Sequence, residues 1–201
     1  MTSRCISWPE AFMRRPHKVA DELGGGDLRS IGRADQVARR VASRPALLRQ
    51  LIDGMTHADP IVRARCADAA EKATRSKPAL LARHKAQLLR LSQSARQQEV
   101  RWHVAQMLPR LRLTTSQARS VMRTLGRWLG HDRSTIVRVF SLQAMADVAT
   151  RHAGFRQAVV RRVRYAAASD RPALISRATR LAQGLDARAG RARTASRESG
   201  R

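Results

Sequence analysis

The chain has 201 residues, of which 40 are Lys or Arg and 15 are Asp or Glu, so its formal net charge is +25. This length can bury a core without metals or disulfides, and the two cysteines, Cys5 and Cys66, lack zinc-ligand spacing, which favours a reduced, cytoplasmic setting. The sequence contains no signal-peptide core and no run of about 18 apolar residues, so we expect neither export nor a membrane span.

The N-terminal part of the chain differs from the rest. Residues 1–33 have no sustained apolar period, and the glycines at 24–26 interrupt the backbone, so we expect a flexible segment there. Residues 34–43 and 45–55 then carry the apolar spacing of two short helices, the second opened by Pro45.

Three longer helix pairs and one final helix are predicted over 59–76 with 78–93, 96–112 with 114–129, 132–151 with 155–168, and 171–185. Asp59 and Asp132 are expected to cap the first helices of their pairs, and Thr114 with Gln117 has capping-box spacing. Gly130 is expected to end its helix in a left-handed conformation. Residues 186–201 are rich in Gly, Ser and Arg, which predicts a disordered basic tail.

One apolar stripe recurs along the chain at steps of 37 or 38 residues. Nineteen of its twenty positions are apolar, Ser141 being the exception. The four copies are Val62, Cys66, Ala69, Ala70 and Ala73; Val100, Val104, Met107, Leu108 and Leu111; Val137, Ser141, Ala144, Met145 and Val148; and Leu174, Ala178, Leu181, Ala182 and Leu185. Helix pairs at this period are typical of an alpha-solenoid.

Two stretches, DPIVRARCADAAEKA and DRSTIVRVFSLQAMADVA, resemble the first helix of HEAT repeats, in which an acidic residue at the turn precedes a Val and an Arg. Pro109 within a first helix is similar to the kink found in HEAT units. The resemblance covers residues 34–185. It implies an all-α, right-handed alpha-solenoid of about four helix pairs plus a C-terminal capping helix, and it identifies a fold without a function.

Little in the sequence indicates catalysis. The six histidines are scattered without metal-ligand spacing, so we expect no metal and no cofactor. Asp68 and Glu71 precede Lys72 and Arg75 by four residues, which predicts ordinary ion pairs on one helix rather than acid-base chemistry. We therefore expect a non-catalytic protein.

The second helices of the three long pairs hold ten Arg or Lys and no acid, whereas the first helices mix both signs. Because the second helices of HEAT arrays line a concave surface, the resemblance implies a basic groove. The partner would be nucleic acid, bound through its phosphates, or an acidic protein segment. The candidate binding residues are Arg83, Lys85, Arg90, Arg119, Arg123, Arg127, Arg161, Arg162 and Arg164.

Two alternatives remain at this point. HEAT-like bacterial DNA glycosylases also have a basic groove, but they need aromatic residues and an acid in it, and the second helices supply no acid. A generic scaffold whose charge reflects an arginine-rich composition is the other alternative. We expect the protein to be a monomer. Trp102 and Trp128 are interpreted as packing residues, and the 3% aromatic content argues against a base-stacking platform.

Overall fold

The computed structural model describes residues 18–27 and 30–198 of the chain. These residues form helices joined by short turns, and the described part of the chain contains no strand. The expectation of an all-helical protein is therefore confirmed. Within the same residues, no helix combines the length and the apolar character needed to cross a membrane.

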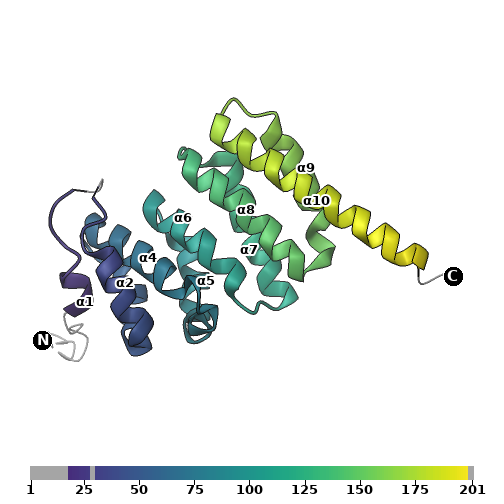
Figure 1. Ribbon diagram of the computed structural model, residues 1–201. Coiled ribbons are helices and arrows are strands. Elements are labelled where there is room, and N and C mark those ends of the chain that lie inside the picture. Colours follow the sequence, from purple (N-terminus) through teal and green to yellow (C-terminus); the bar gives the residue numbers. More distant parts are fainter. Residues whose placement is uncertain (1–17, 28–29, 199–201) are drawn as a thin grey trace, which may run out of the picture.

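Alternate helices pack side by side in chain order and make one layer of the structure (Figure 1). This first layer consists of α2 (Ala34–Ser43), α4 (Pro60–Arg75), α6 (Gln98–Met107), α8 (Thr135–Arg151) and α10 (Pro172–Glu198). Each of these helices contacts the next one in the layer.

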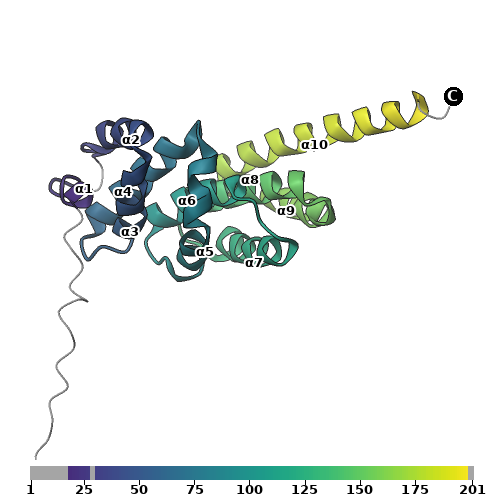
Figure 2. The ribbon, with the colours of Figure 1, turned by 90° about the horizontal axis from the view of Figure 1, so that it is seen from below.

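The intervening helices make a second layer against the first one (Figure 2). It consists of α3 (Leu48–Gly54), α5 (Lys85–Ser94), α7 (Thr115–His131) and α9 (Arg156–Ala167). The short helix α1 (Lys18–Asp21) packs on α3 and α4.

The repeated apolar stripe lies between the two layers. All fifteen of its positions in the first three copies are buried, including the polar Ser141. In the last copy Leu174 and Ala178 are buried, whereas Leu181, Ala182 and Leu185 are half-buried because α10 packs only on α8 and α9. The apolar period thus gave the correct inward face of each first-layer helix.

Two of the predicted helix starts are confirmed by hydrogen bonds. The Asp59 carboxylate accepts a hydrogen bond from the backbone N–H of Ile61 at 2.8 Å, as expected of an N-cap. Thr114 and Gln117 form the complete capping box at the start of α7.

The turn between α7 and α8 differs from the prediction. Gly130 lies inside α7 without a positive φ, and the helix continues to His131. Asp132 is the C-cap of α7, and Ser134 precedes α8, so the expected N-cap at Asp132 is wrong. The Asp132 side chain instead accepts from the Ser134 N–H and from Arg101 of α6, the latter at 2.6 Å.

Prolines lie in 3-10 helices that connect the two layers. Pro78 opens a 3-10 helix, Pro78–His84, before α5 begins, so the single helix expected over 78–93 is in two parts. Pro109 lies in the 3-10 helix Leu108–Arg110 that follows α6, because proline lacks the N–H that an α-helix needs at this point. Further 3-10 helices, Pro45–Leu47 and Ala153–Phe155, precede α3 and α9.

Packing begins before Ala34, the expected start of the folded array. Val19, Ala20 and Leu23 are buried in the common core. The buried guanidinium of Arg65, on α4, donates to five backbone carbonyls of the segment that follows α1: those of Leu23, Gly24, Gly25, Asp27 and Ser30. Residues 1–17, the rest of the segment expected to be flexible, lie outside the described residues.

The last helix is longer than the apolar pattern predicts. The pattern ends near Leu185, but α10 continues as a helix to Glu198 and extends away from the body of the protein (Figures 1 and 2). Alanine and arginine are among the best helix formers, and together they outweigh the glycines of this segment. The expectation of a disordered tail from residue 186 therefore differs from the structure.

Candidate functional site

The nine predicted binding residues all belong to the second layer or to the 3-10 helix that leads into it. Eight of the nine are exposed, and Lys85 is half-buried. We call this set the basic face; by element it consists of Arg83 in the 3-10 helix Pro78–His84, Lys85 and Arg90 on α5, Arg119, Arg123 and Arg127 on α7, and Arg161, Arg162 and Arg164 on α9.

Among the described residues, no side chain of the basic face forms an ion pair. Lys85 donates to the carbonyl of Arg112 at 3.0 Å, which leaves its charge without a carboxylate. Arg162 of α9 lies close to Gly126 of α7. A Cβ atom added at Gly126 would be 3.7 Å from an Nη atom of the Arg162 guanidinium. The Arg162 charge of α9 therefore lies beside α7.

The basic face extends to a less continuous area near α3. Arg83 and Arg49 both lie near His84, and burial together with these two cations holds the pKa of His84 below its usual value. At the other edge of the face, Arg127 borders a hollow that also contains Asp132. The basic face thus has a further cation, Arg49, near Arg83 and a carboxylate, that of Asp132, near Arg127.

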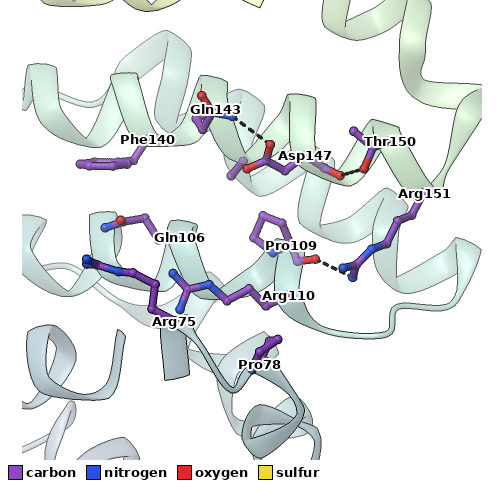
Figure 3. Close-up of a pocket in the computed structure, with 11 residues that line it drawn as sticks. Arg75, Pro78, Gln106, Pro109, Arg110, Phe140, Gln143, Asp147, Thr150 and Arg151 are labelled. Atoms are coloured by element: carbon purple, nitrogen blue, oxygen red, sulfur yellow. Dashed lines mark hydrogen bonds between the residues drawn. The ribbon is translucent and has the colours of Figure 1, made fainter. Parts of the chain in front are cut away.

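A different feature lies on the first layer, where two adjoining hollows run across α4, α6 and α8. They share Arg75, Gln106 and Phe140, and their volumes are about 350 and 330 Å3. Figure 3 shows the first hollow, with Arg75 beside Gln106 and with Phe140, Asp147 and Arg151 on the facing helix. We call the two hollows together the first-layer groove. The HEAT resemblance predicts a groove on the second helices instead.

Charges of both signs line the first-layer groove in equal number. The four arginines are Arg65, Arg75, Arg110 and Arg151, and the four carboxylates are those of Asp68, Glu71, Glu99 and Asp147. This balance contrasts with the net charge of +25 for the whole chain. The first-layer groove is therefore unsuited to a polyanion.

Glu71 organises the middle of the groove. Its buried carboxylate forms ion pairs with Arg75, at 2.6 Å, and with Arg110. Burial opposes the charged form, but hydrogen bonds from both guanidinium groups overcome it and hold the pKa of Glu71 below its usual value. The predicted Glu71–Arg75 and Asp68–Lys72 ion pairs are both confirmed.

His103 lies beside Trp102 on the wall of the groove, with ring centroids 5.4 Å apart. Its side chain is 12% exposed, and burial lowers its pKa to about 4. Asp68 opposes this effect, but its carboxylate is 3.8 Å from His103 Nε2 and already pairs with Lys72. We therefore expect a neutral imidazole at pH 7.

Sequence reasoning missed the first-layer groove. Trp102 packs against the core, as predicted, and its half-buried side chain also lines the groove. The available signal was Ile136, an apolar residue outside the repeated stripe of α8 that the structure leaves 40% exposed. A groove across three helices cannot be read from one helix, because it depends on how those helices are placed.

The described residues contain no group of three or more His, Cys, Asp or Glu side chains arranged to hold a metal ion. No protein-family model matches the chain, and no curated protein matches its sequence. A function must therefore be inferred from the chemistry of the basic face and of the first-layer groove.

Proposed function

We propose that this chain is a non-catalytic binding protein that docks an anionic partner on the basic face of its second layer. Its architecture is proposed to be a right-handed alpha-solenoid of HEAT-like helix pairs with α10 as the final helix. The partner is a nucleic acid bound through its phosphates, or an acidic protein segment. The observation that carries this proposal is a set of nine cationic side chains, mostly exposed, that have no carboxylate partner among the described residues.

The row of arginines on α7 supports a nucleic acid, bound through its phosphates, as the partner. Arg119, Arg123 and Arg127 follow one another at i,i+4 and span about 12 Å along the helix axis. A duplex presents roughly seven phosphate charges over that length of its axis, so each arginine can neutralise one. Like charges at this spacing cost a helix a few tenths of a kcal/mol per pair, roughly, a cost that a bound polyanion would remove.

The test is a salt titration of binding to random-sequence duplex DNA and to a poly-glutamate peptide. Replacing Arg119, Arg123 and Arg127 with Gln should weaken duplex binding equally for every sequence. The slope of log K against log salt should fall by about 2.7, since each phosphate contact contributes about 0.9. The melting temperature should hardly change, because the substitutions relieve repulsion on an exposed face.

The matched control replaces three exposed arginines outside the second layer with Gln. Arg33 lies before α2, Arg39 lies on α2, and Arg180 lies on α10. This control removes the same charge and should leave most of the slope in place. Equal losses from both triples would mean diffuse attraction to a basic chain, and the basic face would no longer be assigned as a site.

The glycosylase alternative requires a carboxylate beside bound DNA. In the structure, the groove carboxylates lie in or beside the first layer, whereas the nine cations belong to the second layer and its leading 3-10 helix. Asp132, which borders the same hollow as Arg127, is 4% exposed and already paired with Arg101. Both observations favour binding without chemistry. Release of alkylated bases by the wild-type chain, lost on Glu99→Gln, would instead support an enzyme.

A further inference from the structure

The first-layer groove carries an unusual concentration of exposed apolar side chains. Of the described residues, three large apolar side chains are exposed: Ile31, Ile136 and Tyr165, at 53%, 40% and 50%. Two of these three, Ile31 and Ile136, line the same hollow, together with the half-buried Trp102 and Phe140. An apolar patch within a hollow, rimmed by polar side chains, is typical of an interaction site.

The Glu99 carboxylate of the groove is exceptional in its surroundings. Asp68 pairs with Lys72, Glu71 pairs with two arginines, and Asp147 accepts a hydrogen bond from Gln143 at 2.9 Å. Glu99 accepts only from the neutral amide of Gln98, and among the described residues it forms no ion pair. In a chain with 40 Lys and Arg, this leaves a negative charge beside the apolar hollow for a cation from outside.

The shape of the groove fits a polypeptide. Helices in contact lie about 8–10 Å apart, so a groove across α4, α6 and α8 extends for about 20 Å, the length of about six residues of an extended chain. At its centre, Gln106 makes one long hydrogen bond of 3.4 Å within the described part of the chain, to the carbonyl of Trp102, and its amide can bind a peptide backbone.

We propose that the first-layer groove binds an extended segment of a partner protein in which a bulky apolar side chain lies next to Lys or Arg. The apolar side chain packs against Ile31, Trp102 and Ile136, and the neighbouring cation pairs with Glu99. The Glu99 carboxylate disfavours an anionic side chain at this position of the ligand. This site is separate from the basic face, and it takes a ligand of the opposite charge.

The test selects peptides from a random 12-residue phage library on the full chain and measures the enriched peptides by fluorescence anisotropy. We expect enrichment of a bulky apolar residue within two positions of Lys or Arg. Ile136→Ser should weaken binding about tenfold, because it removes apolar contact area. Glu99→Gln should weaken it about fivefold, at the upper end for a partly exposed ion pair, and the loss should shrink at high salt.

Two matched controls lie outside the groove. Tyr165→Ser removes a similarly exposed apolar side chain from α9, and Asp170→Asn removes an exposed carboxylate. Both should change the affinity less than twofold. Because all four positions face solvent to some degree, unchanged melting temperatures are expected; if Ile136→Ser unfolds the chain, Glu99→Gln still decides the question.

Three results would overturn the proposal. The first is the absence of any apolar–basic enrichment, or a binding loss that is equal for groove and control variants. The second is enrichment of acidic peptides that depend on Arg119, Arg123 and Arg127, which would place peptide binding on the basic face. The third is a competition result in which a synthetic peptide of residues 1–17 displaces the labelled enriched peptide at a lower concentration than the unlabelled enriched peptide does. That result would make this chain's own N-terminal segment the occupant.

Discussion

His103 should make the stability of the protein depend on pH between neutrality and pH 4. In the unfolded chain its pKa is near the ordinary value of 6.5, whereas burial lowers it to about 4 in the folded protein. Lys72 and Arg75 nearby also lower it, while Asp68 and Glu71 oppose them. The buried Nδ1 atom has no hydrogen-bond partner among the described residues.

The direction of the change in stability follows from the number of protons that each state binds. Below pH 6.5 the unfolded chain binds a proton at His103 and the folded chain does not, so the free energy of unfolding falls as pH decreases toward 4. From these two pKa values, the loss between pH 7.5 and pH 5.0 is about 2 kcal/mol. Above about pH 7.5 both states hold a neutral imidazole, and this residue contributes almost no pH dependence.

The measurement is urea unfolding at pH 7.5 and pH 5.0 for the wild type and for His103→Gln. Gln is polar and of similar size but does not titrate, so the variant should lose less stability between the two pH values, by about 2 kcal/mol. His84 and the carboxylates titrate in both proteins, so their effects cancel in the comparison. An equal loss in both proteins would refute the burial argument for His103.

Two further predictions concern packing and a buried ion pair. A Cβ at Gly54 would lie 2.5 Å from the Cys66 sulfur, so Gly54→Ala should lower the melting temperature at an overpacking cost of about 1–3 kcal/mol. Combination with Cys66→Ala should remove most of that loss; an unchanged loss would mean that another contact is responsible. Arg101→Ala should cost about 2 kcal/mol in urea unfolding, because the Asp132 carboxylate, 4% exposed, then lacks its cation; Arg101→Ala in an Asp132→Asn background should cost clearly less, and equal costs would count against the ion pair.

The sequence was sufficient for features set by local spacing. The stripe through Val100, Val104 and Met107 identified the buried face of α6, since apolar side chains three or four residues apart must share one side of a helix. The capping box of Thr114 and Gln117 was predictable for the same reason, because both partners lie within one turn.

Features that depend on distant partners were not predictable. Asp132 has the local pattern of an N-cap, but its strongest partner, Arg101, is 31 residues away. The basic face could be listed from charge alone, whereas the first-layer groove required the relative placement of α4, α6 and α8.

The hydrogen bonds from Arg65 to backbone carbonyls between Leu23 and Ser30 limit how far this protein can be truncated at its N-terminus. The Nε, Nη1 and Nη2 atoms of one planar guanidinium donate to five carbonyls, three of them at Nη1, a task for which lysine has neither the shape nor the number of donors. A chain begun at Ala34, where the repeat pattern starts, would lose every one of these acceptors and uncover the surface under Ala20 and Leu23. A useful fragment for expression should therefore begin at or before Lys18, well ahead of the first recognisable repeat.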